Sequence, residues 1–555
     1  MAYSRYLNKQ IIVYRAAENV KDELGDPVQD PYTVVGTYRA RYRNLSGRQS
    51  TYLERNTTED FQRIYTTYNA NVQPLDVVKF TELDGTVIKT FSVRRIITPE
   101  RTTRRHHIEL DVVGYDIDFT VEEAEYALAG FTSLWETTTA NETITLPWTN
   151  PGQNVDWGDG NIDQASSHEY ATAGQYTIII GGSITGFRFN DTGDKTKIKT
   201  ITDFSNFDFD NSGIFYGCSD LTITATETPT ISGTNLDNTF RNTSVNIDVS
   251  NWPITSVTSM ADMFTSSSLS DANYALLVEA WSQLSLQSNV SFGAGPAQYA
   301  LESNIFIYRI KRDFNWTITD SGPEIEGNVL NLHAGFEDTI TEISNDVSNW
   351  DDISVLYNND HGQTSAGLRP GTGSSTLNSK NVIDLDNEFL EREDALGLSG
   401  NQALTVFLVI QSDVNVATTD TYYYLGEATG AGGQRIGFSA GSDGYSYRFA
   451  DGNQVFNSPT LGSAQILVFK RASGSTYGDG QFFENGVGQL ETSSGNPTIT
   501  LYLANEKSIV GSSLFAGSNT SFMDGFIAQI IVYNRELLTS EQSTVRDYLE
   551  TEWGL

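Results

Sequence analysis

Three phenylalanines recur at a nearly fixed interval in the middle of this chain of 555 residues. Phe215, Phe240 and Phe264 are 25 and 24 residues apart, and each is followed at the fourth position by a serine. A period in the twenties is typical of a solenoid, because each coil buries one aromatic ring against the next coil. The sequence therefore predicts a short solenoid over residues 191–322, an architecture that serves recognition more often than catalysis.

Both the repeat and its ends carry further signals. Residues 271–286 read as a capping helix and residues 314–319 as a closing strand. The segments 248–252 (DVSNW) and 257–264 (VTSMADMF) resemble the leucine-rich-repeat-like units of bacterial surface proteins. That resemblance implies a stack of similar coils.

A turn-rich stretch precedes the repeat. Residues 155–160 read VDWGDG, and Tyr170 and Tyr176 follow at close range. The glycines permit tight turns, Asp159 can accept backbone amides within one, and the tyrosines can pack against Trp157. None of this requires a ligand. The set resembles the polycystic-kidney-disease repeat, which implies an immunoglobulin-like β-sandwich over residues 134–190.

The first 118 residues have a different pattern. β-Branched and aromatic runs separated by turn signals predict six strands in a small β-barrel or sandwich, at residues 10–15, 32–43, 61–68, 77–80, 87–96 and 107–113. Residues 119–133, with an acidic start and Gly130 near the end, predict a helical linker.

Residues 22–27 (DELGDP), 45–48 (LSGR) and 73–78 (QPLDVV) of this domain resemble the phage head–tail joining family of head-closure, or stopper, proteins. The resemblance implies a homo-oligomeric ring whose lumen passes DNA, with residues 44–60 as the loop that plugs it. It also implies portal, adaptor and tail proteins as partners.

Basic residues are dense in this domain. The candidates for lining the lumen are Arg48, Arg94, Arg95, Arg101, Arg104 and Arg105. They could face DNA or the acidic surface of a neighbouring subunit, but strand alternation would also leave half of them in solvent. The two readings are left open.

The last segment, residues 323–555, contains strand-like runs at sandwich spacing, at residues 347–352, 382–386, 404–410, 466–470, 481–486 and 525–533. A final strand ending in IVYNR, then a helix and Trp553 within WGL, resembles the laminin-G and concanavalin-A-like lectins. The resemblance implies a jelly roll, and glycan binding by analogy of fold alone. The complete chain is thus expected to be mainly β and multidomain.

Few residues suggest chemistry. Asp384, Asp386 and Glu388 alternate along a strand, as glycosidase carboxylates do, but their order departs from the Glu-x-Asp-x-x-Glu pattern of glucanases of this fold, and an ordinary edge strand explains them equally well. Candidate Ca²⁺ ligands are Asp351, Asp352 and Asp360, for which solvated loop acids are the alternative. We expect no enzymatic activity and no other cofactor. The single cysteine, Cys218, excludes an internal disulfide.

Charge separates the chain into two parts. Residues 1–118 hold 17 Lys+Arg and 16 Asp+Glu, and the remainder holds 18 against 54. An acidic surface repels phosphate backbones and anionic lipids, so the long second part is a poor candidate for nucleic-acid or membrane binding. The first ten residues lack the apolar run of a secretory signal, and no segment approaches a membrane span.

The resemblance of residues 1–118, taken with the acidic remainder of the chain, implies a structural virion protein of a phage neck, assembled in the host cytoplasm. Its N-terminal domain would join the head–tail connector ring, and an exposed acidic arm could bind glycans on a host or in the environment. A bacterial surface adhesin is one alternative, although it should carry an export signal and an anchor. A glycan depolymerase is another, and it would need a working carboxylate pair.

Overall fold

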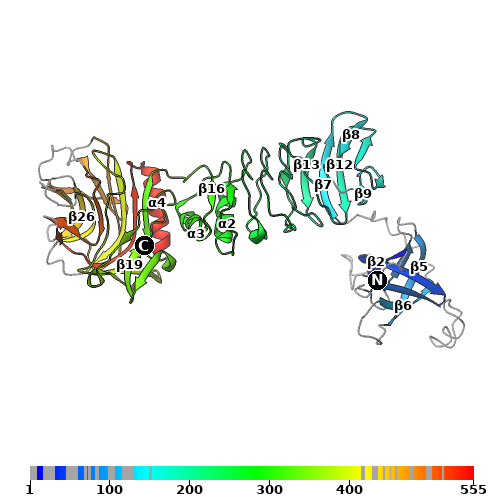
Figure 1. The fold of residues 1–555 in the computed structure, drawn as a ribbon, viewed down its shortest axis with the longest axis horizontal. Helices are drawn as coiled ribbons and strands as arrows, with labels where there is room; N and C mark the ends of the chain where they lie inside the picture. Colours follow the sequence, from blue (N-terminus) through cyan, green and yellow to red (C-terminus); the bar gives the residue numbers. More distant parts are fainter. Residues whose placement is uncertain are drawn as a thin grey trace, which may run out of the picture. The chain divides into compact units, whose positions relative to one another are not determined.

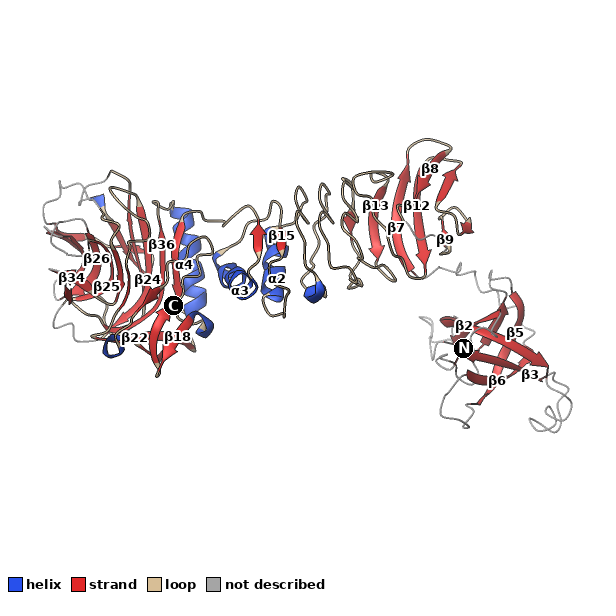
Figure 2. Ribbon diagram, in the orientation of Figure 1, coloured by secondary structure: helices blue, strands red, loops and turns tan. Residues whose placement is uncertain are grey.

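The computed structural model describes residues 9–16, 32–44, 61–67, 72, 77–81, 87–97, 107–114, 130–148, 153–413, 419–427, 435–441, 444–449, 452–456, 459–474, 479–494, 503–515 and 518–555. The chain forms two compact units, Met1–Ala127 and Leu128–Leu555. Strands dominate both units, so the prediction of a mainly β, multidomain chain is confirmed (Figure 2).

The first unit is a six-stranded antiparallel barrel. Its strands are β1 (Lys9–Ala16), β2 (Tyr32–Asn44), β3 (Phe61–Thr67), β4 (Val77–Thr81), β5 (Val87–Ile97) and β6 (His107–Gly114). They pair in the order β1-β2-β3-β6-β5-β4, and β4 pairs again with β1. The register shifts in β1 and β5, and such bulges bend strands and help a sheet to close. Inward-facing side chains form the core, among them Ile11, Val13, Ile64, Val78 and Leu110.

The second unit begins with a sheet that crosses a predicted boundary. Its strands are β7 (Gly130–Thr137), β9 (Val155–Asp156), β10 (Ile162–Asp163), β12 (Gly174–Gly181), β13 (Ile198–Asp203) and β14 (Thr222–Ile223), in the order β10-β9-β12-β7-β13-β14. β8 (Glu142–Thr145) and β11 (Ser167–Tyr170) form a separate pair.

Two predicted boundaries are therefore corrected. β7 starts at Gly130, so the last four residues of the predicted helical linker 119–133 lie in a strand, while residues 119–129 lie outside the described residues. β13 pairs with β7 across the predicted division at residue 190. One hydrophobic core runs from Phe131 to Trp316, because the first sheet and the coils share their apolar faces.

The three phenylalanines stack as the period predicts. The ring centroids of Phe215 and Phe240 are 5.9 Å apart with the planes 10° from parallel, and those of Phe240 and Phe264 are 5.3 Å apart at 25°. The backbone repeats in the same step, since each of these residues donates its N–H to the following coil, at Thr239, Met263 and Gly293. The coils follow one another between β13 and α2 (Asp271–Trp281) in Figure 1.

Each coil bends sharply on both sides of its phenylalanine. Positive φ angles recur two residues before and two residues after the ring, at Gly213 and Gly217, Asn238 and Asn242, and Asp262 and Ser266. Glycine adopts this conformation freely and Asn or Asp tolerates it, so the residue types match the turn. Each coil therefore contains the same five-residue turn, centred on the buried ring.

The end of the coils is helical. The predicted capping helix is α2, whose first turn is capped by the Ser270 hydroxyl accepting from the Asn273 N–H. A second helix that the sequence did not suggest, α3 (Asn304–Phe314), follows it, and Asn315 ends α3 in the left-handed conformation. The closing strand is β16 (Thr317–Thr319), which pairs in parallel with β15 (Ser291–Gly293).

The C-terminal segment is a β-sandwich. One sheet places β17 (Asn328–His333) and β22 (Lys380–Asp386) against β36 (Asp524–Tyr533), followed by β24 (Leu404–Ser412), β29 (Gln465–Arg471) and β30 (Gln481–Glu484). The other contains β23 (Leu390–Arg392), β33 (Lys507–Val510), β25 (Asp420–Gly426), β26 (Arg435–Gly441), β27 (Gly444–Phe449), β28 (Gly452–Phe456) and β32 (Glu491–Ser494). The remaining strands are β18 (Ile340–Ile343), β19 (Asp346–Trp350), β20 (His361–Gly362), β21 (Gly371–Leu377), β31 (Val487–Gly488), β34 (Ser513–Phe515) and β35 (Ser518–Thr520).

The two sheets enclose an apolar core. The rings of Phe438 on β26 and Phe469 on β29 lie 5.3 Å apart across it. The central strand β24 is buried on both faces, because α4 (Thr539–Trp553) covers its outer side. Trp553 is fully buried there, and its Nε1 donates to the side chain of Gln529 at 2.8 Å. The helix and Trp553 that the sequence singled out therefore close one face of the sandwich.

Candidate functional site

The VDWGDG turn is held together by its own side chains. The Asp159 carboxylate accepts the Asn161 N–H at 3.0 Å and lies 2.7 Å from Nε2 of His168. The imidazole of His168 stacks on Trp157, with centroids 5.2 Å apart. Trp157 is fully buried, and its carbonyl accepts the Tyr170 hydroxyl at 2.9 Å. Asp159 therefore acts as a turn residue. The ring that stacks on the Trp157 indole is that of His168, whereas the sequence suggested Tyr170 and Tyr176 for this position.

The candidate glycosidase carboxylates are engaged by backbone amides. Asp384 accepts the N–H groups of Ser374 and Ser375 at 3.1 and 3.2 Å. Glu388 accepts the N–H of Asp386 at 2.6 Å, and partial burial raises its pKa. Asp386 is exposed and lies directly opposite Asp524 in the β22–β36 register. Glu388 is thus bonded to the backbone of Asp386, not to its carboxylate.

The three candidate Ca²⁺ ligands have separate structural partners. Asp352 is fully buried, and its oxygens accept four hydrogen bonds of 2.9–3.0 Å, from the N–H groups of Asn331, Ser354 and Asn359 and from the Ser354 hydroxyl. Burial raises the pKa of Asp352 to about 7. Asp360 accepts the N–H of Asp352, and Asp351 accepts the Tyr308 hydroxyl at 2.6 Å. Across the described ranges, no three His, Cys, Asp or Glu side chains gather in a way that could hold a metal ion.

A polar chain continues from Asp352 into the sandwich core. The Asn359 carbonyl lies 2.9 Å from Nδ1 of His361, and Nε2 of His361 lies 2.7 Å from the Ser508 hydroxyl. Tyr423 reaches the same hydroxyl at 2.8 Å. Burial lowers the pKa of His361 to about 3, so the ring is neutral: Nδ1–H donates to Asn359 and Nε2 accepts from Ser508. All of these side chains are buried, and the chain fixes the core as a satisfied network.

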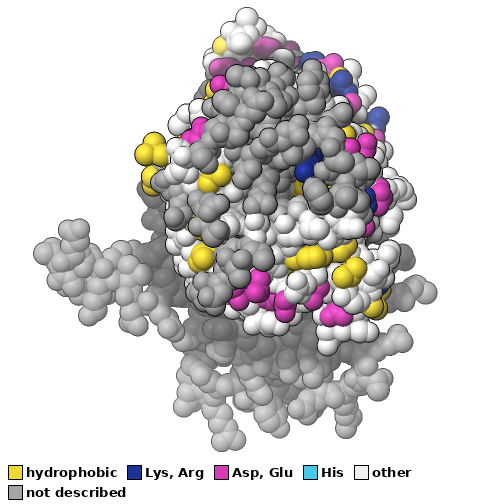
Figure 3. Space-filling model, turned by 90° about the vertical axis from the view of Figure 1, so that its left-hand side faces the viewer, with side chains coloured by type: hydrophobic (Ala, Val, Ile, Leu, Met, Phe, Trp, Pro, Cys, Tyr) yellow, Lys and Arg dark blue, Asp and Glu magenta, His cyan; other side chains and the backbone are white. Residues whose placement is uncertain are grey.

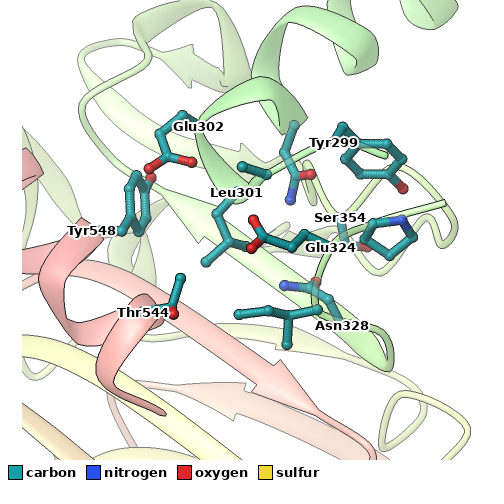
Figure 4. Close-up of a pocket in the computed structure, with 12 residues that line it drawn as sticks. Tyr299, Leu301, Glu302, Glu324, Asn328, Ser354, Thr544 and Tyr548 are labelled. Atoms are coloured by element: carbon teal, nitrogen blue, oxygen red, sulfur yellow. The ribbon is translucent and has the colours of Figure 1, made fainter. Parts of the chain in front are cut away.

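A cavity lies where the last coil meets the sandwich, with a volume of about 70 Å³. Its wall combines residues from the coil end, from the start of β17 and from α4, namely Tyr299, Ala300, Leu301, Glu302, Asn304, Pro323, Glu324, Ile325, Asn328, Ser354, Thr544 and Tyr548. Figure 4 shows Glu324 and Asn328 converging on the middle of the cavity, with Thr544 and Tyr548 on another side. The set contains two carboxylates and no Lys or Arg.

The candidate lumen arginines are only partly covered by the structure. Arg94 and Arg95 lie in β5, whereas Arg48, Arg101, Arg104 and Arg105 lie outside the described residues, as does most of the predicted plug loop 44–60. Their role in a ring stays a prediction. No helix in the described part of the chain is long and apolar enough to cross a membrane.

The sequence reading missed the cavity altogether. Its residues come from positions 299–354 and 544–548, so no local spacing connects them. The paired left-handed positions around each phenylalanine were also overlooked, although the recurring Gly, Asn and Asp at these positions were visible.

The family model that matches describes a Mycoplasma protein of unknown function, DUF285, and matches residues 188–288. This is the segment that contains the three stacked phenylalanines. No curated protein matches the chain.

Several solved structures are similar to part of the chain. A sialidase of Trypanosoma rangeli, in complex with a difluoro nononic acid, is 16% identical over 42% of this chain and 34% of its own, with a TM-score of 0.30. Domain 4 of AbnA, an extracellular arabinanase of Geobacillus stearothermophilus in complex with arabinotriose, is 13% identical over 40% of this chain and 97% of its own, with a TM-score of 0.26. The chain thus spans about a third of the sialidase's length. Similarity at this level assigns neither an activity nor a ligand to this chain.

Proposed function

We propose that the chain is a structural component of a phage neck, in which residues 1–118 join a head–tail connector ring and the second unit is an arm that presents the sandwich. The closed pairing of β1 to β6 supports the first part, because a six-stranded barrel suits the resemblance noted in the sequence. Ring contacts would then belong to the first unit alone. Portal, adaptor and tail proteins are the partners that this placement requires.

The proposal that the second unit is an arm rests on the continuity of its hydrophobic core. A single hydrophobic core joins the first sheet to the coils and to α3, and α3 in turn contacts the sandwich. There, Arg309 makes a bidentate pair with Asp338, with nitrogen–oxygen distances of 2.8 and 2.6 Å. Paired, planar contacts of this kind fix orientation as well as distance. A continuous core with a fixed junction suits a spacer.

The charge of the second part fits the same role. The excess of Asp and Glu over Lys and Arg beyond residue 118 keeps neighbouring copies apart in a ring and keeps the arm in solution. Figure 3 shows acidic side chains gathered along the lower edge of one face of the sandwich. The arm would repel DNA rather than bind it, so DNA would meet only the ring.

Glycan binding by the sandwich is the second element of the proposal, and it rests on the lectin resemblance of residues 323–555. A bacterial adhesin remains the alternative that would use the same three C-terminal parts. The depolymerase alternative has less support, because Asp384 and Glu388 already accept bonds from backbone amides.

Negative-stain electron microscopy of the purified full chain tests the ring. We expect class averages with cyclic symmetry, in which a central ring carries radiating arms. Single arms without a ring, both alone and after mixing with a portal protein, would refute the connector role. Rings seen only when residues 1–118 are deleted would refute it as well, because they would place the contacts in the arm.

A further inference from the structure

The cavity at the junction of coil and sandwich contains buried polar groups without partners. The side-chain amide of Asn328 is 3% exposed, and neither its oxygen nor its nitrogen forms a hydrogen bond of normal geometry within the described part of the chain, although the buried Tyr533 hydroxyl lies beside it on β36. The Tyr299 hydroxyl, in a residue that is also 3% exposed, has none there either. An unpaired buried donor or acceptor costs about 1–3 kcal/mol. Such groups around one cavity indicate a site that a polar ligand completes.

The mouth of the cavity adds acceptors but no cation. Glu302 and Glu324 are exposed and line it, and neither forms an ion pair or a side-chain hydrogen bond with the described residues. Figure 4 places Glu302 beside Tyr548 and Glu324 near Leu301. The apolar part of the wall is formed by Ala300, Leu301, Pro323 and Ile325, and Asn304, Ser354, Thr544 and Tyr548 complete the lining. A ligand therefore meets acceptors at the rim, a donor–acceptor amide inside and apolar carbon between them.

This arrangement discriminates between anions, cations and neutral hydroxylated ligands. Two carboxylates at the rim repel an anion such as an acidic sugar or a phosphate. An ammonium ion has no acceptor lone pair, so it would leave the Asn328 amide nitrogen unpaired. A hydroxyl group both donates and accepts, so a neutral polyhydroxylated ligand can satisfy the amide and the carboxylates together.

The volume limits how much of such a ligand enters. At about 10–15 Å³ for each water-sized site, a cavity of about 70 Å³ holds roughly five to seven heavy atoms. This matches one hydroxylated edge of a sugar ring rather than a complete oligosaccharide.

We propose that this cavity binds the hydroxylated edge of a terminal neutral sugar and excludes acidic sugars. The site rests on the proposed glycan binding by the arm, and it locates that binding at the junction of the sandwich with the last coil. Residues from both parts contribute, so the site exists only when α3 and the sandwich are docked.

The test measures binding of the full chain by titration calorimetry and saturation-transfer NMR. The probes are methyl glycosides of neutral hexoses, with sialic acid as the acidic probe, and a glycan array is run on the same preparation. Thr544→Tyr obstructs the cavity from α4 without removing a buried group. Asn328→Leu removes the unpaired amide and fills the space. Thr551→Tyr is the matched control, because Thr551 lies on the same helix with the same hydroxyl bond to the carbonyl four residues earlier, and is exposed outside the cavity.

We expect neutral glycosides to bind and sialic acid not to bind. Thr544→Tyr and Asn328→Leu should each weaken binding at least about tenfold, and Thr551→Tyr should leave it unchanged. Glycan binding that survives both cavity variants would overturn this site while leaving the proposed glycan binding in place. If no neutral or acidic glycan binds on the array or in solution, the proposed glycan binding itself is refuted. The cavity would then hold only water.

Discussion

Replacing Phe240 by alanine tests whether the stacked rings hold the coils together. Phe240 is fully buried between Phe215 and Phe264, and its ring also lies 6.0 Å from that of Trp252. The truncation removes roughly 150 Å² of buried apolar surface, or about 4 kcal/mol at about 25 cal/mol/Å². Core Phe→Ala changes cost about 3–5 kcal/mol overall, so we expect a loss of about 4 kcal/mol in the free energy of unfolding.

The assay is urea denaturation followed by tryptophan fluorescence, which Trp252 reports from within the coils. Phe240→Leu keeps most of the volume and should cost less than about 1.5 kcal/mol. Tyr216→Ala is the control, because this side chain lies in the neighbouring coil but is only partly buried, with Arg241 over its ring at 5.6 Å. A loss below about 1.5 kcal/mol for Phe240→Ala, or one equal to that of Tyr216→Ala, would refute the reasoning.

Three further predictions follow from buried or paired groups. The folded pKa of Asp352, about 7, lies above its ordinary value of 3.8, so its contribution to stability is present at low pH and is lost as the pH rises from about 4 to 7. The stability of the wild type relative to Asp352→Asn should therefore fall across this window, by at most about 1.4 kcal/mol per pH unit in urea denaturation, and an unchanged difference would contradict the burial argument. Cys218 is fully buried and burial raises the pKa of its thiol, so a thiol reagent should modify it at least about 100-fold more slowly in the folded chain than in urea, and equal rates would disprove its burial. Arg309→Ala removes the bidentate pair with Asp338 at the junction and should speed cleavage by a glutamate-specific protease after Glu324 about fivefold, whereas Arg546→Ala, which removes only surface pairs on α4, should not.

Periodicity in the sequence predicted the strands of the barrel and the stacking of the coils. The six strands of the barrel follow alternation, and Phe215, Phe240 and Phe264 stack because their spacing equals one coil. The boundary at residue 190 was wrong because β13 completes a sheet with β7, and such a nonlocal pairing leaves no local pattern. Helix α3 was missed because Ile305, Ile307 and Ile310 are β-branched and favour strands. The burial of all three, with Ile307 and Ile310 packed in the coil core, determines the helix instead.

The candidate sites were harder to predict, because they too depend on contacts between residues that are far apart in the sequence. Asp351, Asp352 and Asp360 read as oxygen ligands, but their partners are amides and hydroxyls up to 43 residues away along the chain, such as that of Tyr308. The junction cavity brings Asn328 and Thr544, which lie far apart in the sequence, to one site, so it could be found only in three dimensions. The sequence shows which acidic side chains are present, but only the fold shows which of them accept hydrogen bonds from the protein.

Native mass spectrometry of the full chain, of residues 1–127 and of residues 128–555, at several concentrations, tests the central claim most directly. The two fragments correspond to the two compact units. We predict one closed oligomer of fixed copy number for the full chain and for residues 1–127, and a monomer for residues 128–555. A monomeric full chain at every concentration, or an oligomer that persists in residues 128–555 and disappears in residues 1–127, would contradict it.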